Sequence, residues 1–216
     1  MIETSTAIGI FGGSFNPVHL GHLIAANDVI ETLGLRRLYW VPAACSPLKE
    51  GRDLASAEDR CAMVAAAIAG DRRMALSRWE VRRGEPSYTI ATVRHFRARY
   101  PSAELYLVIG TDTLRDLHRW HEVHALLELC RLAIVVRPGH TPRWPAPRLR
   151  QPDPPPVIIP GHSIGISSTE VRRRLAEGKS IRYLVPPPVA DYLQRRRLYR
   201  RHAKLATGEK GKPRVH

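Results

Sequence analysis

Short apolar runs alternate along the chain with segments in which apolar residues recur every three or four positions. The runs have the length of buried strands, and the periodic segments have the spacing of helices packed on one face. The run at 105–110 is the clearest buried strand. Strands are predicted at 7–11, 38–41, 74–77, 105–110, 132–136 and 157–159, and helices at about 18–33, 56–69, 88–100, 122–129, from Ser167 onward, and at 187–200.

This alternation predicts an α/β fold, with a doubly wound, Rossmann-like parallel sheet and helices on both faces. Gly34 and Pro101 stand where the first and third predicted helices should end. Residues 79–81 either extend the third strand or begin a loop. No G-x-G-x-x-G follows a predicted strand, which argues against an ordinary dinucleotide-dependent dehydrogenase.

The remaining segments are predicted to lack regular structure. Residues 43–55 resemble a loop, and the proline- and arginine-rich segment 138–156 is expected to be an exposed loop. We expect a frayed start at 1–6. The predicted organisation is a single domain at 1–202, followed by a basic, disordered tail at 203–216 with few apolar residues to bury.

The stretch from Gly9 to His22 carries the first chemical signal: Gly9-Ile10-Phe11-Gly12-Gly13-Ser14-Phe15-Asn16-Pro17-Val18-His19-Leu20-Gly21-His22. It is interpreted as a strand, a glycine turn and a helix, with His19 and His22 on one face of the first helical turns. A helix N-terminus offers N–H groups and a positive dipole to an anion, and two imidazoles add further donors. The alternative is a tight strand-to-helix connection with two surface histidines.

A second signal is the segment Ile166-Ser167-Ser168-Thr169-Glu170-Val171-Arg172. Ser167 and Glu170 have the spacing of a capping box, so the segment could simply be a well-capped helix start. It could also present N–H groups, hydroxyls and Arg172 to phosphates. A third set of motifs lies between the two signals: Pro86-Ser87-Tyr88-Thr89, Gly110-Thr111-Asp112, Arg119-Trp120 and Arg137-Pro138-Gly139.

The first two signals resemble the G-G-[ST]-F-[DN]-P-x-H-x-G-H and I-S-S-T-x-[IV]-R motifs of the nucleotidyltransferase superfamily, and the third set resembles the bacterial nicotinate-nucleotide adenylyltransferases. The resemblance spans Ile8 to about Leu193. It implies transfer of AMP from ATP to nicotinate mononucleotide, which gives deamido-NAD and pyrophosphate in NAD biosynthesis. Alternatives are the same chemistry on nicotinamide mononucleotide, phosphopantetheine, FMN or a CTP-dependent substrate.

The resemblance also implies roles for individual residues. The catalytic residues would be His19, His22 and the loop lysine Lys49. ATP would be bound by Gly12, Gly13, Ser14, Phe15, Gly110, Asp112, Ile166, Ser167, Ser168, Thr169 and Arg172. Nicotinate mononucleotide would be bound by Asn16, Tyr88, Thr89, Trp120, His121 and Arg137. In the family a tyrosine often follows the tryptophan, where this chain has His121, so the contacts to the pyridine ring remain open.

Composition limits the remaining classes of function. The formal net charge of +14 suits phosphorylated substrates and would also suit nucleic acid. Part of the excess is local to basic residues near the C-terminus, which are usually solvated, so a basic nucleic-acid-binding protein is the less favoured alternative. His118, His121 and His124 are spaced like helical metal ligands but lack a carboxylate or cysteine to complete a set. We expect Mg²⁺ to arrive with ATP. The three cysteines form no disulfide pattern, and no secretory signal or membrane span is visible, so a cytoplasmic location is expected. The sequence allows a homo-oligomer but does not indicate the oligomeric state.

Overall fold

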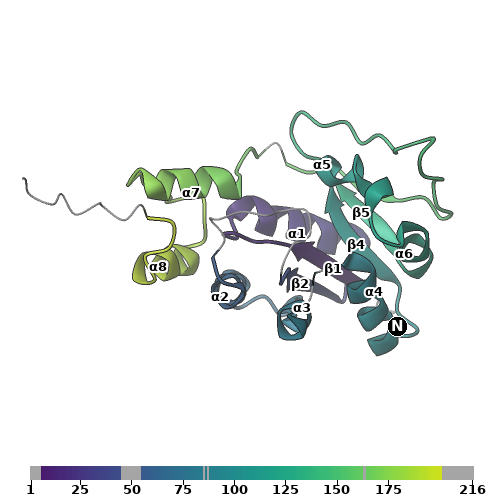
Figure 1. The fold of residues 1–216 in the computed structure, drawn as a ribbon, viewed down its shortest axis with the longest axis horizontal. Helices are drawn as coiled ribbons and strands as arrows, with labels where there is room; N and C mark the ends of the chain where they lie inside the picture. The colour runs from purple at the N-terminus through teal and green to yellow at the C-terminus, as the bar shows by residue number, and fades with distance from the viewer. Residues whose placement is uncertain (1–5, 45–54, 85, 87, 163, 201–216) are drawn as a thin grey trace, which may run out of the picture.

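The core of the computed structural model is a six-stranded parallel sheet (Figure 1). The structure describes residues 6–44, 55–84, 86, 88–162 and 164–200. The strand order is β3-β2-β1-β4-β5-β6, so the chain reverses its direction across the sheet between β1 and β4. The strands are β1 (Ile8–Gly13), β2 (Arg37–Pro42), β3 (Met74–Leu76), β4 (Leu105–Gly110), β5 (Arg131–Val135) and β6 (Val157–Ile159).

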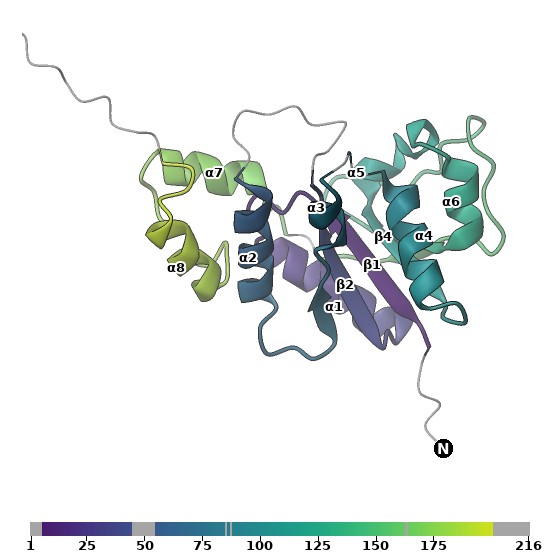
Figure 2. The ribbon, with the colours of Figure 1, turned by 60° about the horizontal axis from the view of Figure 1, so that its bottom comes forward.

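Helices connect the strands and extend beyond the sheet. In Figures 1 and 2, α2, α7 and α8 lie together at the end of the molecule away from α4 and α6. The helices are α1 (Leu20–Leu33), α2 (Ala57–Ala67), α3 (Trp79–Arg83), α4 (Thr89–Arg99), α5 (Thr111–Leu114), the 3₁₀ turn η1 (Leu117–Arg119), α6 (Val123–Leu129), α7 (Ser168–Ala176) and α8 (Pro187–Arg195). Among these described helices, none is both long and apolar enough to cross a membrane.

The two faces of the sheet carry two separate hydrophobic clusters. In β4, Tyr106 and Val108 belong to one cluster, whereas Leu107 and Ile109 belong to the other, as expected for alternating side chains. Buried residues of α1, α2, α7 and α8 join the first cluster. Those of α4, α5 and α6 join the second. The predicted doubly wound parallel sheet with helices on both faces is therefore confirmed.

The glycine turn after the first strand differs from the prediction. Gly12 and Gly13 are the last residues of β1 and pair with β2, so they do not form the turn. The turn follows them, and its left-handed residue is Phe15 (φ 46°), whose ring is buried against Trp40 with centroids 5.1 Å apart. Burial of this ring holds a backbone conformation that a non-glycine residue rarely adopts.

Several helix assignments are also corrected. Residues 79–81 belong to the helix α3, which ends at Gly84 (φ 67°) and is tied to α4 by the hydroxyl of Thr92, which donates to buried Glu80. The short helix α5 and the turn η1 follow β4 and were not predicted. The last helix ends at Arg195 instead of residue 200. Sequence periodicity is weak in such short turns, so it does not reveal them.

The segment 138–156 contains neither helix nor strand, as predicted, but it is not wholly exposed. Leu149 is only 1% exposed and belongs to the cluster beneath α4 and α6. Trp144 packs against that cluster, and its Nε1 donates to the Leu149 carbonyl at 2.7 Å. The predicted tail and most of the predicted loop at 43–55 lie outside the described residues.

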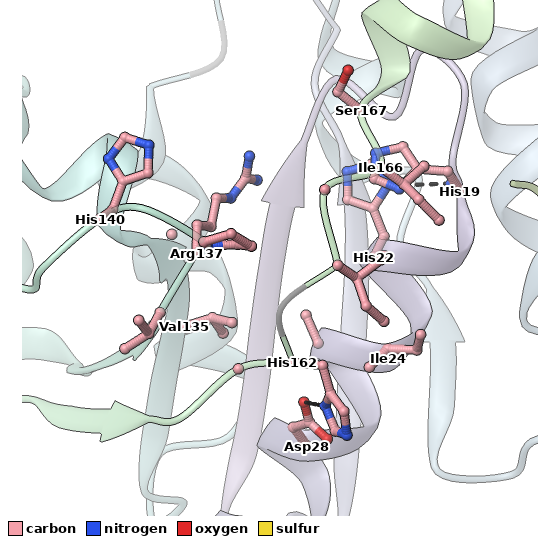
Figure 3. Close-up of a pocket in the computed structure, with 18 of the residues that line it drawn as sticks. His19, His22, Ile24, Asp28, Val135, Arg137, His140, His162, Ile166 and Ser167 are labelled. Carbon is pink, nitrogen blue, oxygen red and sulfur yellow. Dashed lines mark hydrogen bonds and ion pairs between the residues drawn. The ribbon is translucent and has the colours of Figure 1, made fainter.

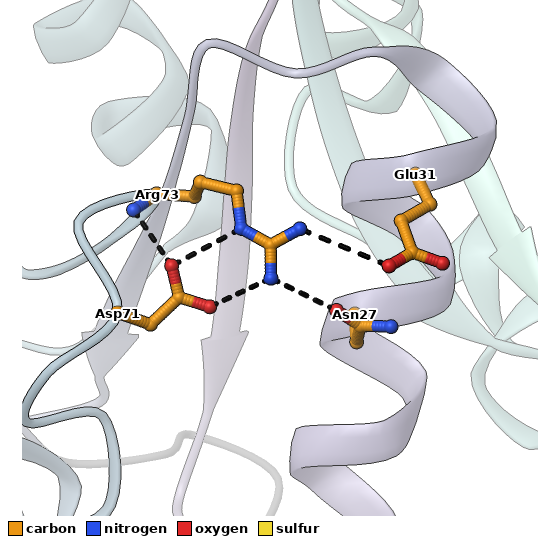
Figure 4. Close-up of polar contacts among 4 residues, drawn as sticks. All are labelled: Asn27, Glu31, Asp71 and Arg73. Carbon is orange, nitrogen blue, oxygen red and sulfur yellow. Dashed lines mark hydrogen bonds and ion pairs between the residues drawn. The ribbon is translucent and has the colours of Figure 1, made fainter.

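A polar clamp fastens the entry of β3 to α1 (Figure 4). The guanidinium of Arg73 contacts Asp71 through two nitrogens, at 3.1 and 2.8 Å. It also donates to Asn27 on α1 at 3.0 Å and lies 3.8 Å from Glu31. The clamp holds one edge of the sheet against the helix that carries His22.

Candidate active site

A cleft lies where the carboxyl ends of β1, β4 and β5 meet α1 and the segment leading into α7 (Figure 3). This is the position at which the strand order reverses, and open α/β sheets bind ligands at such a point. Its lining combines polar and apolar groups from segments far apart in sequence: Phe11, His19, Gly21, His22, Ile24, Ala25, Asp28, Gly110, Val135, Val136, Arg137, Pro138, His140, Gly161, His162, Ile164, Gly165, Ile166 and Ser167.

The two histidines of the first motif lie side by side at the start of α1, with their ring planes tilted by 30°. Their ring centroids are 3.7 Å apart. His19 is the N-cap residue, and His22 Nδ1 accepts a hydrogen bond from the His19 backbone N–H at 3.2 Å. The prediction that both rings share one face at the helix start is confirmed.

His19 is a neutral imidazole in the free protein at pH 7. Burial, with a smaller contribution from the positive charge of Arg137, lowers its pKa to about 4. Its Nδ1 is buried and has no hydrogen-bond partner among the described residues. A negatively charged ligand would oppose both effects and favour the protonated ring.

The start of α1 offers fewer free N–H groups than the sequence suggested. The Leu20 N–H donates to the Leu184 carbonyl at 2.9 Å, so the segment before α8 already occupies it. The His22 N–H donates to the His19 carbonyl at 2.9 Å. An anion at this end of the cleft would therefore meet the imidazoles more directly than a row of helix amides.

The start of α7 matches its predicted capping. The Ser167 hydroxyl accepts from the Glu170 N–H at 3.1 Å. The two neighbouring side chains, however, contact the first motif: the Ser168 hydroxyl donates to the Pro17 carbonyl at 2.9 Å, and Arg172 Nη1 donates to the Asn16 carbonyl at 2.9 Å. The two sequence motifs are therefore joined by direct hydrogen bonds.

A third group of residues comes from the ends of β4 and β5. Arg137 Nε lies 3.3 Å from Asp112 Oδ1, and the Arg137 N–H donates to the Thr111 hydroxyl at 3.1 Å. A side chain on Gly110 would place its Cβ 2.4 Å from the Asp112 carboxylate and 2.9 Å from Arg137. Glycine at this position lets the ion pair close over the strand end.

The predicted site residues fall into three groups. The first group lines the cleft: His19, His22, Gly110, Arg137, Ile166 and Ser167. Asp112 lies next to the cleft, where it forms an ion pair with Arg137. Lys49 lies outside the described residues. The remaining predicted residues are described but do not line this cleft: Gly12, Gly13, Ser14, Phe15, Asn16, Tyr88, Thr89, Trp120, His121, Ser168, Thr169 and Arg172.

The residues predicted for the acceptor lie around the start of α4 and the turn after η1. The rings of Tyr88 and His121 approach each other with centroids 4.8 Å apart. Trp120 is half-buried and packs against the cluster beneath α4 and α6. Asn16 stands apart from them, because it is a buried residue of the first motif and its side-chain oxygen accepts from the Ala55 N–H at 3.0 Å.

Sequence reasoning missed several residues of the site. His162 Nδ1 contacts Asp28 at 2.9 Å on the cleft wall, and His140 also lines the cleft (Figure 3). Arg60 is 3% exposed and donates to the carbonyls of Ser14, Ala44 and Ala55 at 2.9–3.2 Å. Asp28 could have been noticed because it lies on the same helix as His22. The sequence of α2 gives no indication that Arg60 donates to the carbonyl of Ser14, the residue after Gly13.

Metal ligation by the chain itself finds no support in the part that the structure describes. It contains no cluster of three His, Cys, Asp or Glu side chains able to hold a metal ion. His118 lies in η1, whereas His124 lies in α6, so the spaced histidines do not share one helix. These residues do not form a cage for a resident cation.

Comparisons with known proteins agree with this geometry. The cytidylyltransferase-like family model matches residues 10–174. Proteins named probable nicotinate-nucleotide adenylyltransferase from Thermus thermophilus and Opitutus terrae are 45% and 44% identical to this chain. Each alignment covers 89% of the chain, with 99% and 97% of the respective relatives.

A solved structure shares the fold. It is a Plasmodium falciparum nicotinic acid mononucleotide adenylyltransferase complexed with NaAD, with a TM-score of 0.70 and 21% identity. The match covers 89% of this chain and 97% of that one. From the family model and the relatives together, this chain belongs to the cytidylyltransferase-like family and, within it, to the nicotinate-nucleotide adenylyltransferases.

Proposed function

We propose that this enzyme transfers AMP from ATP to nicotinate mononucleotide, releasing pyrophosphate and forming nicotinate adenine dinucleotide for NAD biosynthesis. The observation that carries the proposal is the joining of two motifs at one cleft. The histidine pair at the start of α1 and the capped start of α7 both line the cleft at the point where the strand order reverses. The two motifs are linked by the hydrogen bond from Ser168 to the Pro17 carbonyl, 151 positions away. The relatives' names supply the substrate class.

The reaction needs positioning and charge stabilisation more than a covalent nucleophile. The phosphate of the mononucleotide would attack the α-phosphorus of ATP in line, and pyrophosphate would leave. His19 and His22 would donate to the transferring phosphate and the leaving group, with Lys49 assisting. Because His19 is neutral in the free protein, binding of the triphosphate would raise its pKa and draw a proton to the cleft.

The cleft would also bind ATP. Its apolar wall, formed by Ile24, Ala25 and Val135, would hold the base, and Asp112 would accept hydrogen bonds from the ribose. The phosphates would then lie toward His22 and Ser167. Since the described side chains form no metal cage, Mg²⁺ would enter as part of the ATP substrate. We also propose that the enzyme acts in the cytoplasm.

The acceptor would occupy the region around the start of α4. There Tyr88 and His121 already form one ring contact, and Trp120 would offer its indole face to the electron-poor pyridine ring. The backbone near Thr89 would donate to the nicotinate carboxylate, which only accepts hydrogen bonds. The amide of the nicotinamide analogue would place its own donors against donors there.

The test is pyrophosphate release from ATP with a panel of acceptors. We expect nicotinate mononucleotide to be preferred over nicotinamide mononucleotide by at least about a hundredfold in kcat/KM. His22→Ala should lower turnover by about two to three orders of magnitude, the scale for losing one charge-stabilising donor. The exposed His124, which does not line the cleft, provides the control variant His124→Ala.

Three outcomes would each contradict a separate part of the proposal. Equal use of both mononucleotides would refute the acceptor assignment while leaving adenylyl transfer intact. Transfer to phosphopantetheine or FMN in preference to either mononucleotide would show that the enzyme uses a different acceptor. Normal turnover in a folded His22→Ala protein would refute the role of the histidine pair.

A further inference from the structure

The C-terminal part of the described chain returns to the first motif. After α8, Leu198 N–H donates to the Leu193 carbonyl at 3.2 Å, and the backbone passes through left-handed conformations at Arg197 (φ 52°) and Tyr199 (φ 60°). This path places the Tyr199 hydroxyl against Asn16, to whose Oδ1 it donates at 2.5 Å. The two residues are 183 positions apart in sequence.

Asn16 is a junction between several segments. It is 3% exposed, and its Oδ1 accepts from both Tyr199 and the Ala55 N–H, while its carbonyl accepts from Arg172 at 2.9 Å. It lies three residues before His19, whose backbone in turn bonds His22. A shift of Asn16 would therefore be passed along a short, buried stretch of chain to both imidazoles.

The backbone on both sides of this contact is strained. Tyr199 and, next to Asn16, Phe15 (φ 46°) both adopt the left-handed region that non-glycine residues rarely enter. Such conformations persist where the surrounding contacts determine them, and they are concentrated at functional sites. Burial also raises the pKa of Tyr199, so its hydroxyl stays a donor throughout the neutral range.

A second tyrosine on the same segment makes a different kind of contact. The Tyr192 hydroxyl donates to Asp59 Oδ1 at 2.8 Å, where Arg196 Nε also binds at 3.2 Å. Asp59 belongs to α2 and does not line the cleft. Tyr192 therefore fastens α8 to α2, whereas Tyr199 contacts the motif that carries the histidines.

We propose that Tyr199 is a positioning residue for the transfer reaction, whose hydroxyl fixes Asn16 and thereby the placement of His19 and His22. This inference rests on the proposed function of the histidine pair. The C-terminal segment is then part of the active-site architecture, although it lies outside the matched family region of 10–174. Small misplacements of reacting groups reduce turnover steeply, so loss of one hydroxyl should be measurable in kcat.

The experiment compares Tyr199→Phe with Tyr192→Phe. Each change removes one hydroxyl that donates to a buried side chain, and both leave the ring in place. We expect Tyr199→Phe to lower kcat about tenfold, with the KM for ATP changed less than about twofold. Tyr192→Phe should keep the wild-type kcat and should lower Tm by at least as much as Tyr199→Phe.

A second readout does not depend on activity. In NMR spectra of the full chain, Tyr199→Phe should shift the imidazole resonances of His19 and His22, and Tyr192→Phe should leave them in place. An unchanged kcat with unshifted resonances, or equal kcat losses in both variants that follow their Tm, would overturn the inference. A wild-type protein without adenylyl transfer would refute the proposed function instead, and the resonances would still decide whether Tyr199 positions the histidines.

Discussion

At the scale of single residues, the cleft combines one arginine with a neutral histidine. Arg137 lies at the end of β5 and contributes to the low pKa of His19, although burial contributes more. The free cleft thus avoids an additional buried charge. The same groups would favour a negatively charged ligand, because an anion offsets the charge of Arg137 and stabilises protonated His19.

The first prediction concerns stability at low pH. The unfolded state protonates His19 near its ordinary pKa of 6.5, whereas the folded state does so only at about 4. Between these values the unfolded state binds more protons, so the free energy of unfolding should fall as the pH is lowered from 6.5 to 4. We expect His19 to contribute about 3 kcal/mol to this decrease. Urea unfolding of wild type and His19→Gln across this range measures it.

His19→Gln is informative because it removes the titrating group while keeping a polar side chain of similar reach. The variant should lose part of the decrease seen in the wild type, although His95, whose pKa burial also lowers, still contributes. Parallel pH profiles for the two proteins would show that His19 is not held neutral by the fold.

A second prediction compares two glycines near the strand ends. The Cβ of Gly110→Ala would meet the flexible ends of Asp112 and Arg137, whereas that of Gly161→Ala would lie 2.4 Å from the Val136 carbonyl oxygen. Side chains can rotate away, but backbone cannot move without wider rearrangement. Gly110→Ala should therefore keep its Tm within a few degrees and raise the KM for ATP, while Gly161→Ala should lower Tm clearly. The reverse pattern would contradict this account.

At the scale of elements, polar clamps place the helices that carry the site. Arg73 joins the entry of β3 to α1. Arg60 of α2 joins Ser14, which follows β1, to Ala44 and Ala55. Arg60 is buried, so its hydrogen bonds to three carbonyls should matter more than those of an exposed arginine. The position of α1 relative to the sheet therefore depends on residues outside the chemical motifs.

The third prediction measures the clamp of Arg73. Its side chain is 44% exposed, so the ion pairs are partly screened, but the two-nitrogen contact with Asp71 is favourable geometry. Arg73→Ala should lower the free energy of unfolding by about 1 kcal/mol and leave kcat unchanged. The control is Arg72→Ala, which removes the same charge at the neighbouring position. The Arg72 side chain forms no ion pair among the described residues. Equal losses in the two variants would show that the clamp adds no stability of its own.

At the scale of the whole molecule, the described chain closes on its own first motif. Residues of α7, α8 and the segment that follows pack on the cluster beneath α1, and Tyr199 is the last of them to contact the motif region. The sequence beyond, residues 205–216, is glycine- and lysine-rich and has little to bury.

The fourth prediction follows from this arrangement. Deleting 205–216 should leave Tm and kcat almost unchanged, because every described contact of the C-terminal segment is retained. A shorter protein that ends before Tyr199 supplies the comparison and should lose turnover. A large fall in Tm or kcat on removal of 205–216 alone would show that these residues have a role in the fold or the reaction.

The sequence by itself determined the fold class and the reaction class. Apolar runs such as that of β4 are local patterns, and their alternation with helical spacing specifies a parallel sheet covered on both faces. The cap at Ser167 was also readable, because a capping box involves residues only three positions apart. The histidine pair was predicted for the same reason.

The tertiary structure decided how the motifs meet. Phe15 is left-handed because its ring is buried against Trp40, and Arg172 contacts Asn16 because the sheet's winding brings α7 back to β1. The neutrality of His19 depends on burial, which no local pattern shows. Short turns such as η1 and the path of Tyr199 are also set by packing between segments far apart in sequence. Local periodicity carries no information about such contacts, so only the folded chain reveals them.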